Sequence, residues 1–197
     1  MKKRSSLWAL LAVAAVLALA IGGRMLVWSG AEHGGGGGVG GPFALTDHAG
    51  RAVTDQTYRG RWMLIYFGYT FCPDICPTSL STIAAALDGL APEERAKVQP
   101  LFVTVDPERD TPAVMKDYVA AFAPDLIGLV GTPEQTEAVK KAYRVYAVKA
   151  KSDDPTAYTV DHSSIIYLMG PDGRFVPYFA HGTTSAALLA GLRERLR

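Results

Sequence analysis

The alternation of hydrophobic and polar positions predicts an α/β domain that begins at about residue 42. Residues 62–67 form a continuous apolar run of strand length, which indicates a strand buried on both faces. Apolar side chains then recur at helical spacing from Leu80 to Leu90, which predicts a helix that begins at about Pro77. Similar patterns predict a hairpin over 43–54, strands over 101–105, 127–130, 164–168 and 175–179, and helices over 112–122, 133–143 and 184–196.

The order of these elements predicts a mixed sheet with helices on both faces. In the second predicted helix, Val114, Tyr118 and Phe122 share one face. The polar stretch 149–159 is typical of a surface loop or the tip of a long hairpin. Residues 170–173, with the sequence Gly-Pro-Asp-Gly, predict the turn that joins the last two strands.

The N-terminus carries a basic flank followed by an apolar run over residues 7–23. Such a flank keeps the N-terminus in the cytoplasm and directs the rest of the chain across the membrane. We expect residues 1–28 to be an anchor with a single transmembrane helix, and a cleaved signal peptide is the alternative. Both place the domain outside the cytoplasm. The glycine-rich residues 29–41 are expected to be a flexible tether, which leaves 42–197 as the globular domain.

The composition supports a globular domain and excludes two other classes of protein. The chain is 49% hydrophobic and 20% charged, which fits neither a disordered segment nor a nucleic-acid binder. Its formal charge of +1 includes Lys2, Lys3, Arg4 and Arg24, which all precede the domain. The domain itself is therefore neutral to mildly acidic, and nothing in it attracts a phosphate backbone.

The chain contains two cysteines, Cys72 and Cys76, between the predicted strand over 62–67 and the following helix. With Pro77 at the first helical position, Cys76 is expected to cap the helix, where the helix dipole favours a thiolate. The spacing of four residues places both thiols on one face of a turn, which suits either a disulfide or two bonds to one metal ion. A structural disulfide is natural in an exported protein, but closing so short a loop removes little chain entropy.

A metal site needs a third ligand, and His162 is the strongest candidate among the four histidines. It directly precedes a predicted buried strand, so its imidazole lies at a strand end. A histidine in such a place also commonly serves as a structural hydrogen-bonding group. His33 lies beside the glycine tether and His48 in a polar turn, so both are expected to be solvated, whereas His181, between a strand and a helix cap, is expected either on the surface or in support of the metal ligands.

Four segments together resemble the Sco/SenC family of copper chaperones for cytochrome c oxidase. They are FGYTFCPDICP (67–77), VTVDPERDT (103–111), VDHS (160–163) and GPDG (170–173). The resemblance runs in order from about residue 42 to the end of the chain. It implies a thioredoxin-like fold, one N-terminal membrane helix, and copper ligands at Cys72, Cys76 and His162.

The resemblance also implies a location and partners. The protein would lie in the inner membrane as a single-pass protein with its domain in the periplasm. Its partners would be the copper-accepting subunit of cytochrome c oxidase and, as a further candidate, another periplasmic copper chaperone.

The chemistry of the ligands agrees with copper. Two thiolates and an imidazole suffice for three-coordinate Cu(I), whereas a closed structural zinc site takes four ligands. Cu(II) can bind if an oxygen completes the set, and Asp161 and Asp106 are the auxiliary candidates. Asp161 can instead orient the imidazole or be solvated, and Asp106 can instead cap the following helix. The methionines in apolar runs, Met63, Met115 and Met169, are expected in the core rather than as thioether ligands.

A thiol–disulfide oxidoreductase that keeps the oxidase's copper-site cysteines reduced is the alternative function, and a redox or copper sensor is another. Two features argue against a reductase as the main role. The cysteines are separated by three residues rather than two, and His162-Ser163 stands where reductases of this fold carry a cis-proline. Enzymatic activity therefore stays open as a secondary property. A peroxidase is disfavoured, because the threonine-rich segment and the arginine partner of its reactive cysteine are not identifiable.

Overall fold

The computed structural model describes residues 38–150, 152 and 157–197. The predicted membrane anchor and most of the predicted tether lie outside these residues. Within the described part of the chain, no helix is both long enough and apolar enough to cross a membrane.

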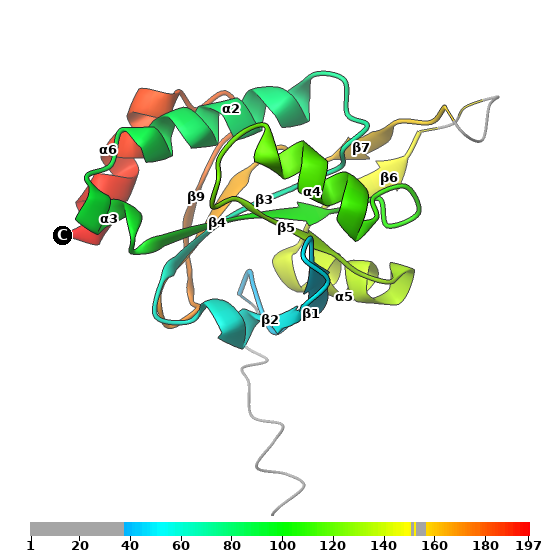
Figure 1. Cartoon of the computed structure of the whole chain (residues 1–197), viewed down its shortest axis with the longest axis horizontal. Helices are drawn as coiled ribbons and strands as arrows, with labels where there is room; N and C mark the ends of the chain where they lie inside the picture. Colours follow the sequence, from blue (N-terminus) through cyan, green and yellow to red (C-terminus); the bar gives the residue numbers. More distant parts are fainter. Residues whose placement is uncertain (1–37, 151, 153–156) are drawn as a thin grey trace, which may run out of the picture. The chain divides into compact units, whose positions relative to one another are not determined.

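A seven-stranded mixed sheet forms the centre of the domain, in the order β2-β1-β5-β4-β3-β8-β9 (Figure 1). The three central strands run parallel, and the other pairs are antiparallel. The bounds are β1 Ala44–Asp47, β2 Ala52–Thr54, β3 Trp62–Gly68, β4 Val98–Thr104, β5 Ile127–Val130, β8 Ile166–Met169 and β9 Phe175–Phe179. The expectation of a mixed sheet is confirmed.

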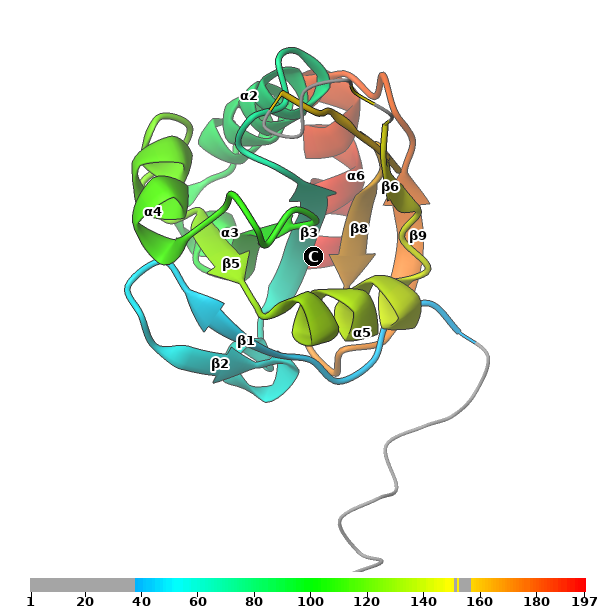
Figure 2. The same cartoon turned by 90° about the vertical axis from the view of Figure 1, so that its right-hand side faces the viewer.

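Helices cover both faces of this sheet, as Figure 2 shows with α2 and α4 on one side and α5 on the other. The bounds are η1 Asp55–Tyr58, α2 Ile75–Asp88, α3 Pro92–Arg95, α4 Pro112–Ala120, α5 Pro133–Tyr143 and α6 Ser185–Leu196. Strand β3 is buried on both faces because its side chains alternate between the two helical layers. Phe67 packs on Tyr143 of α5, whereas Gly68 faces Cys76 of α2.

Helix α2 begins two residues earlier than the sequence predicts. Its N-cap is Asp74, so Cys76 lies inside the first turn and does not cap the helix. The prediction placed Pro77 at the first helical position, but the first four N–H groups of a helix have no intrahelical acceptor. Proline therefore costs no hydrogen bond anywhere in this first turn.

Helix α4 turns Met115, which the sequence predicts in the core, toward the sheet, and covers the stripe of Val114, Tyr118 and Phe122 only in part. Met115 and Val119 are buried, while Val114 is 38% exposed and Tyr118 is half-buried. Apolar residues occupy both stripes of this helix, so periodicity alone cannot choose between them. The choice is made by Gly128 of β5, whose missing side chain leaves the space that Met115 fills.

A separate two-stranded sheet carries the candidate histidine. Strand β6 (Ala147–Lys149) pairs antiparallel with β7 (Val160–His162), so the predicted polar stretch is part of a hairpin. Part of its tip lies outside the described residues. His162 ends its own short strand, so it does not begin the buried strand β8.

Candidate metal centre

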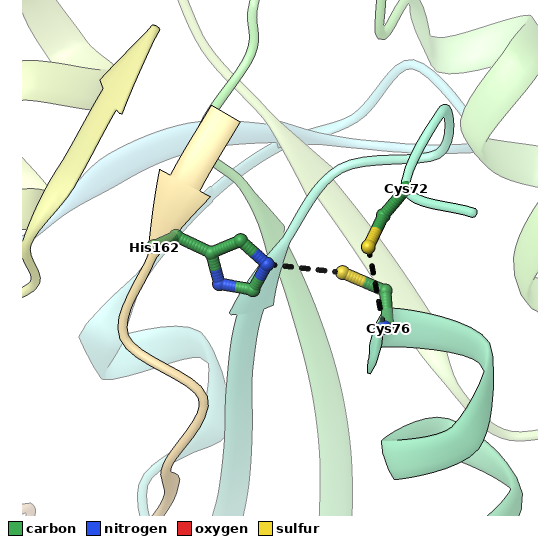
Figure 3. Close-up of side chains that lie close together, drawn as sticks. All are labelled: Cys72, Cys76 and His162. Carbon is green, nitrogen blue, oxygen red and sulfur yellow. Dashed lines mark hydrogen bonds between the residues drawn. The ribbon is translucent and has the colours of Figure 1, made fainter. Parts of the chain in front are cut away.

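The two cysteines come from one segment, the loop after β3 and the first turn of α2 (Figure 3). Cys76 is fully buried and Cys72 is half-buried, and both are free thiols. The backbone N–H of Cys76 donates to Sγ of Cys72 at 3.4 Å. Gly68 makes room for the pair, since a Cβ atom there would lie 2.6 Å from Sγ of Cys76.

His162 reaches this pair from the distant hairpin. Its Nε2 lies 3.3 Å from Sγ of Cys76, and the ligand atoms of the three side chains all lie within 4.8 Å of one another. Nδ1 lies 3.0 Å from the carbonyl oxygen of Ser163, which can only accept, so Nδ1 carries the proton. In the neutral ring Nε2 then keeps its lone pair toward the sulfur.

Two tyrosine rings hold the imidazole in place. Tyr69 and Tyr66 both meet His162 edge-on, with ring centroids 5.8 and 6.2 Å away. The hydroxyl of Tyr69 accepts the backbone N–H of Val160, which ties the cysteine loop to strand β7. The histidine is therefore oriented both by its own strand and by the loop that carries Cys72.

The two thiols differ in their electrostatic environment. The pKa of Cys72 is lowered to about 3, chiefly by its hydrogen bond with the Cys76 side chain, and further by the His162 side chain and the backbone N–H groups of Cys76 and Asp74. The pKa of Cys76 is raised, first by its hydrogen bond to Cys72 and then by burial. These directions favour a thiolate at Cys72, with the remaining proton of the coupled pair at Cys76.

A buried carboxylate anchors the cysteine loop to the sheet. Asp110 accepts the backbone N–H of Thr70 and hydrogen bonds from the hydroxyls of Thr70 and Thr104, both at 2.6 Å. Burial raises the pKa of Asp110. Because Thr70 lies two residues before Cys72, this anchor restricts where the half-buried thiol can lie.

The auxiliary candidates Asp161 and Asp106 do not belong to the group that gathers among the described residues. Asp161 is exposed and lines a cavity of about 350 Å³ beside Cys72, between the cysteine loop and the hairpin. Asp106 is buried and accepts hydrogen bonds from Arg109 and Tyr158. Asp106 also does not cap helix α4, because the N-cap of that helix is Thr111.

The remaining methionine and histidine candidates among the described residues are not part of the Cys–Cys–His group. Met63, Met115 and Met169 are buried in the core, as predicted. His48 differs from the prediction, since its Nδ1 accepts the N–H of Gly128 at 3.0 Å and joins the β1–β2 turn to β5. His181 is exposed, and His33 lies outside the described residues.

The sequence predictions missed the residues that position the site. Gly68, Tyr69, Thr70 and Asp110 all lie within the first two of the segments that carry the family resemblance. That shared location is the one signal that points to them, because none has a metal-binding or nucleophilic side chain in a recognisable spacing.

The fold and the gathered side chains define a mixed α/β protein with a Cys–Cys–His group able to hold a metal ion. The family model described as SCO1/SenC matches residues 31–197. The chain therefore belongs to the SCO1/SenC family. Its mixed sheet with flanking helices fits the thioredoxin-like fold of Sco proteins.

Known relatives extend beyond the matched region. "Protein SCO1 homolog, mitochondrial" of Homo sapiens is 42% identical over 160 residues, which are 81% of this chain and 53% of the relative. The protein of the same name from Mus musculus is 44% identical over 81% of this chain and 56% of its own length. The chain thus spans about half the length of these curated relatives.

Solved structures of similar proteins include several with copper bound. Bradyrhizobium japonicum ScoI with copper bound is 49% identical, with a TM-score of 0.73, over 79% of this chain and 98% of that chain. Yeast Sco1 with copper bound is 38% identical, with a TM-score of 0.75, over 81% of this chain and 88% of that chain.

Proposed function

We propose that this chain is a membrane-tethered, extracytoplasmic copper chaperone that delivers copper to the copper centre of cytochrome c oxidase. The observation that carries the proposal is the meeting of Cys72, Cys76 and His162, whose ligand atoms lie within 4.8 Å of one another. Two thiolates and one imidazole suit Cu(I), which accepts three soft or borderline ligands. The copper-bound state of two similar Sco structures supports the same metal.

The protonation pattern of the apo site suits reversible metal binding. Cys72 offers a thiolate from the start, and Nε2 of His162 offers a lone pair. Cys76 loses its proton when the metal binds, so loading releases a proton to solvent. The cavity beside Cys72 gives an acceptor protein access to the half-buried sulfur.

The proposal includes the location and the partners implied by the family resemblance. The apolar run over residues 7–23 would hold the protein in the inner membrane, with residues 29–41 as the tether and 42–197 in the periplasm. The acceptor would be the copper-binding subunit of the oxidase, and another periplasmic copper chaperone would be a source of the metal. Cu(II) would need a fourth ligand, for which Asp161 is the better candidate, because it lines the cavity beside Cys72 whereas Asp106 is paired with Arg109 and Tyr158.

Thiol–disulfide exchange is the second candidate, favoured by the lowered pKa of the half-buried Cys72 thiol. A thiolate that is accessible and paired with a second cysteine can attack a disulfide in another protein. This activity would serve the same target, because cysteines of an acceptor site must be reduced before they bind copper.

The substitution His162→Ala separates the two functions. Three-ligand binding predicts that the variant loses Cu(I) affinity by at least about 10- to 100-fold against a competing chelator, while its reduction potential changes little. His181→Ala is the control, because that exposed histidine is not part of the gathered group. X-ray absorption should show two sulfurs and one nitrogen in the wild type. Unchanged Cu(I) affinity in His162→Ala would refute the three-ligand site.

A further inference from the structure

Arg109 lies where the two metal-binding segments meet. Its guanidinium carbon is 3.7 Å from the ring centroid of Tyr158 and 4.8 Å from that of Phe71. Tyr158 belongs to the β6–β7 hairpin, four residues before His162, and Phe71 directly precedes Cys72. The same guanidinium lies 5.6 Å from the ring of Tyr69. One side chain therefore touches both of the segments that supply ligands.

Hydrogen bonds fix the orientation of this guanidinium. Nε of Arg109 donates to Asp106 at 2.5 Å, and Nη1 donates to the carbonyl oxygen of Tyr158 at 2.9 Å. The hydroxyl of Tyr158 donates to the other oxygen of Asp106 at 2.7 Å. Asp106, Arg109 and Tyr158 thus form a closed ring of contacts, and the carboxylate at its base is fully buried.

No backbone ladder among the described residues joins the hairpin that carries His162 to the central sheet. Strand β7 pairs with β6 in a sheet of two strands that is separate from the central sheet. It is linked to the cysteine loop and the start of α2 by the hydrogen bond from Val160 to Tyr69, by the contacts of His162 with Tyr69 and Cys76, and by Arg109. The distance between His162 and the two cysteines therefore depends on side chains rather than on a continuous strand ladder.

We propose that Arg109 is a positioning residue that holds the hairpin and the cysteine loop together and so places His162 for the metal. This inference rests on the proposed copper-binding function. A planar, always charged guanidinium can stack on two rings while it donates to a carboxylate and a carbonyl, which a lysine cannot do at once. Arg109 touches no ligand atom, and its effect on the metal passes through the backbone of the two segments.

The inference is tested by combining Arg109→Leu with His162→Ala and measuring Cu(I) affinity against a competing chelator. In the wild-type background, Arg109→Leu should weaken Cu(I) binding about 10- to 100-fold, the range found when an outer partner of a metal ligand is lost. In the His162→Ala background, the same change should alter the affinity less than about two-fold, because the ligand it positions is gone. X-ray absorption of Arg109→Leu should show a weakened or missing nitrogen ligand with both sulfurs kept.

Lys149→Gln is the matched control. Lys149 also lies over the ring of Tyr158, at 4.5 Å, and pairs with Glu108, but it does not contact the cysteine loop in the contacts described. This variant should bind Cu(I) like the wild type. If Arg109→Leu does not fold, Arg109→Lys replaces it and should give a smaller loss, because the charge beside Asp106 stays while the stacking plane is lost.

Three outcomes separate the inference from the proposed function. If His162→Ala alone leaves Cu(I) affinity unchanged, the three-ligand function fails. If His162→Ala weakens binding and the Arg109 variants do not, the positioning role fails. A loss from Arg109→Leu that is equally large in both backgrounds would show a general effect on the fold or on the cysteines, which also overturns the positioning role.

Discussion

Sγ of Cys76 and Nε2 of His162 lie 3.3 Å apart although 86 residues separate them in the chain. The contact joins the first turn of α2 to the end of β7. The two cysteines, by contrast, are neighbours in sequence and meet in one turn. The three-residue group therefore combines a local pair with a residue that only the tertiary structure can bring near.

Oxidation of the pair and copper binding should exclude each other. A disulfide between Cys72 and Cys76 leaves no thiolate to donate to the metal. We expect the reduced protein to take up about one Cu(I) ion per chain and the oxidised protein essentially none. Anaerobic titration of both forms measures this, and equal uptake would remove both cysteines from the ligand set.

Alkylation of the apo protein should distinguish the two thiols by pH. Because the pKa of Cys72 is lowered to about 3, its thiolate persists as the pH falls far below the ordinary thiol value of about 8.5. The raised pKa of Cys76 keeps that thiol protonated through neutral pH. Iodoacetamide at about pH 6 should therefore modify Cys72 and spare Cys76. Peptide mass spectrometry identifies the site, and preferential labelling of Cys76 would contradict the assignment.

The substitution Gly68→Ala should disturb the site through steric overlap. The added methyl would lie 2.6 Å from Sγ of Cys76 and 2.9 Å from the ring of Phe102, so the sulfur must move away from its present place beside His162. We expect a loss of about 1–3 kcal/mol in stability, together with weaker Cu(I) binding. Denaturant unfolding and chelator competition measure the two effects.

Gly128→Ala is the control for this prediction. Its methyl would overlap Met115 on the same side of the sheet, away from the cysteines. A similar loss of stability without a change in Cu(I) affinity is expected. If both variants weakened copper binding equally, the effect of Gly68→Ala would come from general destabilisation.

The domain should fold without its N-terminal segment, and contacts of residues 39 and 40 should add to its stability. Val39 packs against the core, and the N–H of Gly40 donates to the carbonyl of Ala142 at 2.9 Å. A protein that begins at residue 42 should fold, while one that begins at residue 38 should be more stable by about 1–2 kcal/mol. Thermal and denaturant unfolding of both compare them. A molten spectrum for the longer protein would contradict the domain assignment.

The sequence predicts an element well where local signals agree. Helix α5 matches its predicted bounds because Thr132 caps it, Pro133 fits the first position and the apolar spacing is unambiguous. Helix α2 begins earlier than predicted, since proline is tolerated throughout the first turn. The buried face of α4 depends on Gly128, a residue of another element. Such a choice is made by packing and leaves no trace in the periodicity of the helix.

In the metal centre, too, contacts between residues close in sequence could be predicted, and contacts between distant segments could not. The spacing of Cys72 and Cys76 predicts their approach, whereas the place of His162 before a predicted strand makes it only a candidate, which the family resemblance and the observed geometry then support. The ring of Asp106, Arg109 and Tyr158 could not be predicted, because it forms between loops that have no periodic pattern. Asp106 is an example, since the sequence made it an auxiliary ligand candidate, whereas its carboxylate accepts a hydrogen bond from Arg109 and is not part of the Cys–Cys–His group.

The origin of the three side chains also sets an order of events during synthesis of the protein. In a newly made, unfolded chain the two cysteines stay within one turn of each other, while His162 lies on the order of tens of ångströms away. A disulfide can therefore form before the chain has folded, whereas the complete Cys–Cys–His group exists only afterwards. Copper retention by all three side chains would thus mark a molecule whose folding is finished. A cell that keeps the two thiols reduced until folding is complete would obtain a protein ready for copper, whereas an oxidant that reached the unfolded chain first would leave an empty disulfide that must be reduced again.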